Sequence, residues 1–438
     1  MARNMHLGAV FMLGQTQWAI GEWALPGYRS GEWTKPDIWQ ETARMLERSK
    51  FDVMFFADSL AANDHYGNSP DAAIKYSLQF PEHDPVPMIP YLADVTSHIG
   101  IAATSSVSYA HPYGVARTFQ TLANLTSGRA AWNVVASSFR AEAANFGLDA
   151  VTPHDIRYDR ADEFIDVCKK LWSSWEPDAI LEDRQDRIWS DPQKIRAIDH
   201  EGDYYKCRGP LNVIPPVTGP PVLFGAGQSG RGLGFCARNV EVVFGIQFNV
   251  EGMRRQRELL HSKLESFGRD PASVPVMWGV FPIIGQTEDA AAEKEQMIRE
   301  NVPPEGGLAF LSNHMGFDAS VVDLDGSLAS IDDVSEYSQG ISKALTTDFG
   351  EVGSVREMAQ MYGSGLGMHV VGTPESVADQ LEALYDGSGG DGFLLLSSGI
   401  PGALKEFTEG VVPILQERGR FRKEYSGDTL RHHLEERF

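Results

Sequence analysis

The sequence contains few cysteines and a shortage of basic side chains, and each shortage excludes a class of protein. Its 438 residues include three cysteines, Cys168, Cys207 and Cys236, which lie far apart and show no metal-ligand spacing. We expect buried free thiols rather than a disulfide framework or a zinc site. Lys and Arg number 38 against 60 Asp and Glu, and the formal net charge of -22 would repel nucleic-acid phosphates and anionic lipid. Neither nucleic acid nor a membrane surface is expected as a partner.

Long hydrophobic runs and several catalytic signatures are also missing. No stretch approaches the roughly 20 apolar residues that cross a bilayer, and Met1 to Asn4 leads into an apolar segment without the layout of a signal peptide. We therefore expect a cytoplasmic protein. The sequence shows no Ser-His-Asp order, no metal-ligand cluster, no paired carboxylates, and neither a GxGxxG dinucleotide fingerprint nor a Walker loop. An enzyme without these devices is expected to take its chemistry from a cofactor.

The composition that remains is that of an ordinary globular protein. Hydrophobic residues make up 42% of the chain and charged residues 22%, which allows a large core. Apolar runs of the length of buried strands recur along the chain. The eight candidate strands are 7–13, 53–57, 99–103, 130–136, 222–226, 241–244, 276–284 and 392–396.

Helical patterns fall between these strands, and their alternation predicts a parallel sheet. The candidate helices are 36–50, 113–126, 158–172, 252–267, 288–300, 374–385 and 403–417. Eight strands favour a closed (β/α)8 barrel, a TIM barrel, over an open sheet, although counting alone leaves the open sheet possible. Three segments, about 61–90, 177–221 and 303–350, do not fit this alternation. We interpret them as insertions in a single domain that spans residues 1–438.

The loops after the strands carry the candidate site, because TIM barrels place their chemistry there. The Gly-rich stretch 225–232 follows a strand and precedes a helix, a context that suits a phosphate, but tight-turn dihedrals would explain its glycines equally well. Asn133 ends a strand, with Ser137 and Ser138 just beyond it, so these residues either bind a ligand or close a loop. Tyr158 begins a helix, where its phenol either binds a phosphate or packs beside Arg160.

Four stretches of the sequence form a recognisable set: FDVMFFAD (51–58), TSGRAAWNVV (126–135), RYDRADEF (157–164) and GAGQS with RG (225–232). Together they resemble the bacterial-luciferase-like flavin monooxygenases, in particular the subgroup of nitrilotriacetate monooxygenase component A and dibenzothiophene sulfone monooxygenase. The tail 417–431 is similar to the ending of that subgroup, so the resemblance runs nearly end to end.

The resemblance implies a (β/α)8 barrel that receives reduced FMN from a separate NAD(P)H:flavin reductase, in a transient encounter, and uses O2 to oxygenate a small organic substrate. We also expect a homodimer or homotetramer. By similarity, Asp58, Thr104 and Asn133 lie beside the isoalloxazine and ribityl chain. The residues expected around the phosphate are Ser137, Tyr158, Gly227 and Ser229. Ser138 and Gln228 are further candidates for binding the cofactor.

The substrate side is less closely defined by the resemblance. Trp18 stands where relatives that oxidise polycyclic sulfones tend to carry a histidine, so we expect a different pocket, lined by Phe11, Trp18 and Phe244 and suited to an apolar or aromatic substrate. His314 is the first candidate for the acid-base group, and His111 is the second. For each histidine, a purely structural role in its loop is the alternative.

The segment 303–350, rich in glycine and opened by two prolines, is expected to act as a weakly packed lid.

Two other functions are also compatible with the sequence. One is a deazaflavin-dependent dehydrogenase on the same barrel, and the other is a non-catalytic flavin-binding protein.

Overall fold

A computed structural model describes residues 4–29, 31–227, 229–328, 331 and 353–436 of the chain. Within these residues, eight parallel strands close on themselves, and each coincides with one of the predicted strands to within three residues at either end. The strands are β1 (His6–Met12), β2 (Val53–Ala57), β3 (Gly100–Ser106), β4 (Ala130–Val135), β9 (Val222–Gly225), β10 (Val242–Gly245), β11 (Val276–Ile284) and β13 (Gly392–Leu396).

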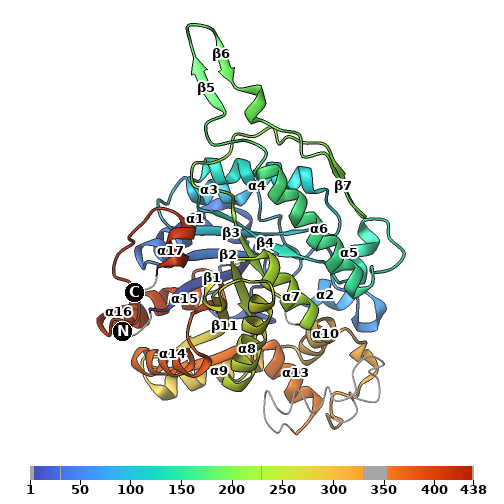
Figure 1. The fold of residues 1–438 in the computed structure, drawn as a ribbon. Coiled ribbons are helices and arrows are strands. Elements are labelled where there is room, and N and C mark those ends of the chain that lie inside the picture. Colours follow the sequence, from blue (N-terminus) through green and yellow to red (C-terminus); the bar gives the residue numbers. More distant parts are fainter. Residues whose placement is uncertain (1–3, 30, 228, 329–330, 332–352, 437–438) are drawn as a thin grey trace.

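The order of the strands around the barrel follows the order of the sequence. Each strand from β1 to β11 pairs with the next barrel strand, and β13 pairs with both β11 and β1, which closes the ring. All of these pairs are parallel, as expected when a helix connects each strand to the next. The predicted (β/α)8 barrel is therefore confirmed (Figure 1).

Helices cover the outside of the barrel (Figure 1). Two helix starts were readable from sequence: α1 begins at Pro36, and α14 begins at Pro374, where the Thr373 hydroxyl accepts a hydrogen bond from the Ser376 N–H. The α-helices are α1 (Pro36–Arg48), α2 (Asp71–Tyr76), α3 (Met88–Ala93), α4 (Pro112–Leu125), α5 (Arg140–Asn145), α6 (His154–Trp172), α7 (Gly230–Asn239), α8 (Val250–Ser266), α9 (Glu288–Asn301), α10 (Pro304–Met315), α13 (Val355–Gly363), α14 (Pro374–Ser388), α15 (Gly402–Glu406), α16 (Val412–Glu417) and α17 (Leu430–Glu435).

Shorter helical turns complete the secondary structure. A single π-helical turn, η7 (Phe407–Val411), joins α15 to α16. The 3-10 turns are η1 (Glu22–Ala24), η2 (Glu32–Thr34), η3 (Tyr66–Asn68), η4 (Pro192–Lys194), η5 (Pro271–Ser273) and η6 (Ala319–Val321).

Two hydrophobic layers hold the barrel together, because successive side chains of a strand point to opposite faces. Phe55 of β2 contacts Phe224 and Phe244 of strands across the barrel, so these rings fill its interior. Phe11 of β1 instead packs edge-on against Trp39 of α1, in the layer between strands and helices. The interior is a packed core, and the site must lie at its rim.

One further strand and two antiparallel pairs of strands lie outside the barrel. β12 (Met368–Gly372), which the sequence analysis missed, pairs in parallel with the far end of β11. The segment 177–221 contains two short antiparallel hairpins, β5 (Ile180–Asp183) with β6 (Ile188–Ser190) and β7 (His200–Glu201) with β8 (Lys206–Cys207). The β5–β6 hairpin projects from the body of the molecule, at the top of Figure 1.

The expectation that residues 303–350 form a weakly packed lid is wrong for the first part of the segment. Residues 304–315 form α10, eight of whose twelve residues are buried. Pro304 occupies the first helical position, where proline is compatible with the helix, and Gly307 allows close contact, since a Cβ there would lie 2.1 Å from the Ala359 carbonyl oxygen of α13. These features build a helix–helix contact rather than a hinge. Residues 329–330 and 332–352 lie outside the described part of the chain.

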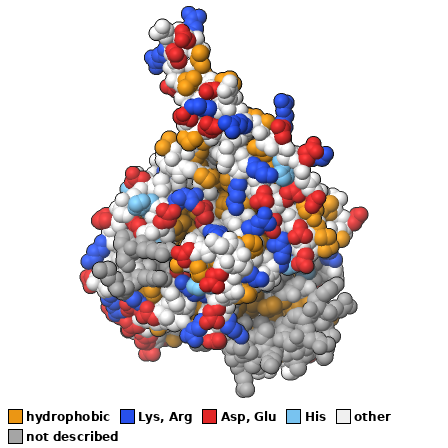
Figure 2. Space-filling view, viewed as in Figure 1, with side chains coloured by type: hydrophobic (Ala, Val, Ile, Leu, Met, Phe, Trp, Pro, Cys, Tyr) orange, Lys and Arg blue, Asp and Glu red, His pale blue; other side chains and the backbone are white. Residues whose placement is uncertain are grey.

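The face shown in Figure 2 carries intermixed acidic and basic side chains, with hydrophobic side chains on the projecting hairpin. Cys168, Cys207 and Cys236 are buried free thiols, as expected. Among the described residues, no helix has the length and apolarity needed to span a membrane, and no group of three or more His, Cys, Asp and Glu side chains is arranged to hold a metal ion.

Candidate active site

The loop after β9 and the first turn of α7 form one end of the site. Ser229 caps α7, and its Oγ accepts a hydrogen bond from the Gly232 N–H over 2.9 Å. The first turn of a helix presents backbone N–H groups and the positive end of the helix dipole. This end of the site can therefore hold an anion such as a phosphate.

Close packing explains the glycine at position 227. A Cβ there would lie 2.5 Å from the carbonyl carbon of Gly232, which no side chain could tolerate. Neither Gly227 nor Gly232 has a positive φ. The alternative that these glycines serve the dihedrals of a turn therefore does not hold at these two positions. Gln228, the third residue predicted here, lies outside the described part of the chain.

The first turns of α6 lie against this loop. His154 Nε2 is 3.2 Å from Ser229 Oγ, and the Tyr158 hydroxyl also hydrogen-bonds to Ser229. Burial raises the pKa of Tyr158, so its phenol stays a neutral donor at ordinary pH. His154 is not among the residues predicted from the sequence. The four-residue spacing to Tyr158 on a helix was the available signal, because it places both rings on one face.

Arg157 connects α6 to the loop after β4. Its Nη1 donates to the Ser137 carbonyl oxygen over 2.7 Å, while its Nε is buried without a hydrogen-bond partner in the described structure. The Ser137 hydroxyl is buried and lies 2.9 Å from Ser106 Oγ of β3. Ser138 is exposed. Arg157 thus brings a positive charge close to the predicted phosphate residues. It was not itself predicted as a site residue, although it opens the stretch 157–164 that resembles the family.

Asn133 and Thr104 lie between this anion-binding end and the middle of the barrel mouth. Thr104 Oγ1 donates to the Phe56 carbonyl oxygen and accepts from Asn133 Nδ2, both over 2.8 Å. Asn133 is 4% exposed, and its Oδ1 is buried without a partner in the described structure. A buried acceptor of this kind is costly unless a ligand supplies an N–H or O–H group.

A cavity of about 370 Å³ lies over the middle of the barrel mouth, and we call it the inner cavity. Most of its wall is apolar or aromatic. Its lining residues are Met12, Trp18, Ala57, Asp58, Ser59, Gln79, Phe139, Ile246, Phe248, His314, Met315, Tyr362 and Leu366.

Trp18 and His314 are the two predicted substrate-side residues that line the inner cavity. The indole N–H of Trp18 donates to the Val10 carbonyl oxygen over 2.8 Å, which fixes the ring in the wall. His314 is the last polar residue of α10, and its ring meets Phe310 edge-on with centroids 4.3 Å apart. The side chain is open to the cavity, but the protein surrounding it lowers its pKa to about 4. His314 is therefore neutral at physiological pH.

The other predicted substrate-side residues lie elsewhere. Phe11 faces the helix layer, because its neighbour Met12 takes the inward position on β1 and lines the cavity in its place. Phe244 belongs to the packed interior below the cavity. His111 is exposed and caps α4, where its Nδ1 accepts from the Tyr113 N–H over 3.2 Å.

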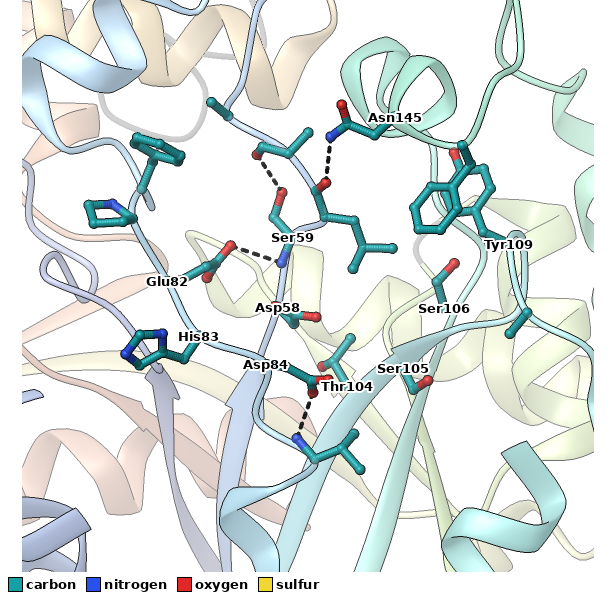
Figure 3. A pocket seen from close by; sticks show the side chains of 18 residues that line it. Asp58, Ser59, Glu82, His83, Asp84, Thr104, Ser105, Ser106, Tyr109 and Asn145 are labelled. Carbon is teal, nitrogen blue, oxygen red and sulfur yellow. Dashed lines mark hydrogen bonds between the residues drawn. The ribbon is translucent and has the colours of Figure 1, made fainter. Parts of the chain in front are cut away.

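A second cavity, of about 550 Å³, adjoins the first, and we call it the outer cavity (Figure 3). Asp58 and Ser59 line both cavities. Burial, together with the nearby Asp84 and Glu142 carboxylates, raises the pKa of Asp58 to about 7. Glu82 also lines the outer cavity, and burial raises the pKa of its carboxyl well above the usual range.

The sequence shows no paired carboxylates, but the fold brings four acidic side chains close enough to influence one another, namely Asp58, Glu82, Asp84 and Glu142. Asp58 follows β2, Glu82 and Asp84 precede α3, and Glu142 lies on α5. These positions are separated by 24 residues or more, except Glu82 and Asp84, so no sequence motif joins them. The barrel topology alone brings them together.

Two proteins that are named monooxygenases match the chain over nearly its whole length. The chain is 38% identical over 439 residues to dibenzothiophene-sulfone monooxygenase of Rhodococcus erythropolis (strain XP), with 99% of this chain and 96% of the relative covered. It is 36% identical over 441 residues to nitrilotriacetate monooxygenase component A of Aminobacter aminovorans, again covering 99% and 96%.

A solved structure and a family match extend these similarities. The crystal structure of riboflavin lyase with modified FMN and riboflavin superposes with a TM-score of 0.88 at 31% identity, covering 98% of this chain and 95% of that one. Residues 21–392 match the family described as luciferase-like monooxygenase. The matched region includes every cavity-lining residue named above apart from Met12 and Trp18, and the relatives are matched over nearly their whole length. The chain belongs to the luciferase-like monooxygenase family.

Proposed function

We propose that this chain is the oxygenase of a two-component system, which binds reduced FMN and uses O2 to add one oxygen atom to a small organic substrate. Family membership supports the reaction class. The observation that carries the proposal is the continuity of the site. The site residues follow consecutive strands of the barrel: Ser229 comes after β9, Asn133 lies on β4, and Asp58, which lines the inner cavity, comes after β2, with β3 between β4 and β2. This order matches phosphate, ring and substrate.

The residues present fit FMN. Ser229, Tyr158 and the first turn of α7 would hold the phosphate, with the Arg157 charge close by. Asn133 Oδ1 would accept a hydrogen bond from the ribityl chain or the ring. A related protein of known structure is described as a complex with modified FMN. The cofactor when bound supplies the two electrons that reduce the second oxygen atom of O2 to water while the first enters the substrate.

The inner cavity supplies what such a reaction needs from the protein. Trp18 and the aromatic wall around it keep water away from the reacting oxygen. His314, neutral because its pKa is about 4, can offer one ring nitrogen as a donor and the other as an acceptor to the substrate without delivering a strong acid. No residue needs to act as a nucleophile.

A separate flavin reductase is the second component. One relative is named as component A of its monooxygenase, and this sequence has no nicotinamide-binding fingerprint. We further propose a homodimer or homotetramer. Leu181, Ile188 and Trp189 on the projecting β5–β6 hairpin are each about half exposed, and a two-stranded hairpin with apolar side chains facing water is marginal alone.

The proposal is tested by measuring O2 consumption and substrate oxidation under three conditions: the chain with NADH alone, with NADH plus oxidised FMN, and with NADH, FMN and an unrelated flavin reductase. Turnover in the third condition only is expected. Robust oxidation by the chain and NADH without a reductase would refute the two-component proposal.

A further inference from the structure

The wall of the inner cavity contains two side chains that can themselves accept an oxygen atom. They are the thioethers of Met12, at the end of β1, and Met315, at the last position of α10. Thioether sulfur is soft and polarizable, and it is readily oxidised to the sulfoxide. A cavity in which O2 reacts would therefore expose part of its own wall to oxidation.

The two thioethers differ in how accessible they are. Met12 is 2% exposed and packs in the hydrophobic core beside Val10 and Phe55, in register with Ala57 of β2. Met315 is 36% exposed, and its flexible, unbranched side chain lies at the end of a helix. Met315 is therefore the thioether that has room to meet an oxidant.

The neighbours of Met315 belong to the substrate side of the site. His314, the preceding residue, lines the same cavity, and its ring lies 5.8 Å from the ring of Tyr362, measured between centroids. Tyr362 lines the cavity as well. In the proposed function His314 contacts the substrate, so the Met315 sulfur lies close to the place where oxygen is transferred.

A second methionine provides an internal reference for this position. Among the described residues, the exposed methionines are Met297 and Met315, and Met297 is the more exposed of the two, at 42%. Met297 lies on α9 and lines neither the inner nor the outer cavity. Hydrogen peroxide dissolved in the medium reacts according to exposure and would oxidise Met297 at least as fast as Met315. Preferential oxidation of Met315 would thus require an oxidant that acts inside the cavity.

We propose that Met315 is an oxidation site built into the inner cavity, and that its sulfur takes up oxygen when no organic substrate is bound. This inference rests on the proposed function, because O2 and reduced FMN are the co-reactants. One atom of O2 forms a bond to the Met315 sulfur, which is oxidised by two electrons to the sulfoxide. The other atom leaves as water, with two electrons and two protons that come from reduced FMN.

The modification would change the cavity in a defined way. A sulfoxide is polar, whereas the thioether that it replaces is apolar. The surrounding wall contains Ile246, Phe248 and Leu366, which offer the new oxygen no hydrogen bond from their side chains. The oxidised cavity is therefore expected to bind apolar substrates less well, so that turnover without substrate gradually impairs the enzyme.

Peptide mass spectrometry tests the proposal. The chain is mixed with reduced FMN and ¹⁸O2 in the presence of catalase, which removes free hydrogen peroxide, and without organic substrate. We expect labelled sulfoxide at Met315 to exceed that at Met297 by about tenfold or more, because the cavity holds sulfur and oxidant together. A parallel sample treated with hydrogen peroxide alone, without FMN, should show no such preference.

A probe that occupies the cavity provides the matched arm. Methyl phenyl sulfide, a small neutral thioether, should lower the labelling of Met315 several-fold while it becomes a labelled sulfoxide itself. Equal labelling of Met315 and Met297, or a probe that gains ¹⁸O without protecting Met315, would overturn the proposal. So would a labelled probe with unlabelled Met315 in the sample without probe, and in that case the proposed function would stand. If neither the probe nor any methionine gains ¹⁸O, the proposed function is refuted together with this inference.

Discussion

His154 Nε2 lies 3.2 Å from Ser229 Oγ, so that α6 and α7 meet at a single serine. The serine also caps α7 through the Gly232 N–H, and the Tyr158 hydroxyl reaches it from the same helix as His154. Three hydrogen bonds therefore fix one hydroxyl at a helix start. In the proposed function this hydroxyl is a phosphate ligand, and its geometry is set before any ligand arrives.

Tyr158→Phe and Ser229→Ala should each weaken FMN binding by about 1 to 3 kcal/mol, the range for losing a hydrogen bond to a charged group. Ser229→Ala should also lower the free energy of unfolding by about 1 kcal/mol, because it removes the cap of α7. Fluorescence titration with FMN measures the first effect. Riboflavin, which lacks the phosphate, is the control ligand and should bind parent and variants alike. Unchanged FMN affinity in both variants would place the phosphate elsewhere.

His314→Ala should divert O2 consumption from product to hydrogen peroxide while changing FMN affinity by less than about 0.5 kcal/mol, as expected for a residue away from the phosphate end. The matched control is His111→Ala, which should cost about 1 kcal/mol of stability through the lost α4 cap and leave coupling unchanged. Product and peroxide are quantified per O2 consumed. Full coupling in His314→Ala would remove this histidine from the mechanism.

Because the protein around the cavity lowers the pKa of His314 to about 4, its titration should not appear in the pH profile of kcat near neutrality. The raised pKa of Asp58, about 7, is the one expected to appear there. Comparing the parent with Asp58→Asn between about pH 5.5 and pH 8.5 separates the two groups. An inflection near neutrality that persists in Asp58→Asn and disappears in His314→Ala would contradict this assignment.

Stability should depend on pH through Glu22, which is fully buried and accepts hydrogen bonds from the Gln17 and Gly399 N–H groups. Burial raises its pKa from 4.5 to about 8. Between these values the folded chain keeps a proton that the unfolded chain releases, so this group makes stability fall as pH rises, until the fall ends above about pH 8. Relative to Glu22→Gln, the parent should lose stability across this window in denaturant titrations. A constant difference between the two would contradict the burial argument.

The β5–β6 hairpin should determine the oligomeric state. Replacing Leu181 and Trp189 together with serine should shift the mass measured by light scattering toward the monomer without unfolding the barrel. Val217→Ser is the matched control, because it removes a fully exposed apolar side chain outside the hairpin. A parent that is already monomeric would refute the proposed oligomer.

The sequence was sufficient for the barrel because each strand is a short apolar run between helical stretches, a pattern that survives without tertiary information. The sequence did not show which side chains of β1 face the barrel interior. Phe11 and Met12 are both apolar, so only the structure shows that Met12 faces the cavity. β12 was missed because its five residues include only two of the aliphatic side chains that mark a buried strand.

The composition of 303–350 was misleading for a similar reason. Glycine promotes flexibility in a loop but also allows close contact in a helix, and at Gly307 of α10 it does the second. The carboxyl cluster of the outer cavity was invisible because Asp58, Glu82 and Glu142 are distant in sequence. Long-range juxtaposition of this kind follows from the closed barrel, not from local pattern.

The most direct test of the central claim is a single turnover with labelled oxygen. The chain is mixed with chemically reduced FMN, ¹⁸O2 and a panel of organic substrates, without NADH or reductase, and products are examined by mass spectrometry. The account predicts one ¹⁸O atom in the product for each reduced FMN consumed, and none when reduced FMN is omitted. Substrate oxidation that carries no ¹⁸O, or that proceeds without O2 when a deazaflavin replaces FMN, would contradict it.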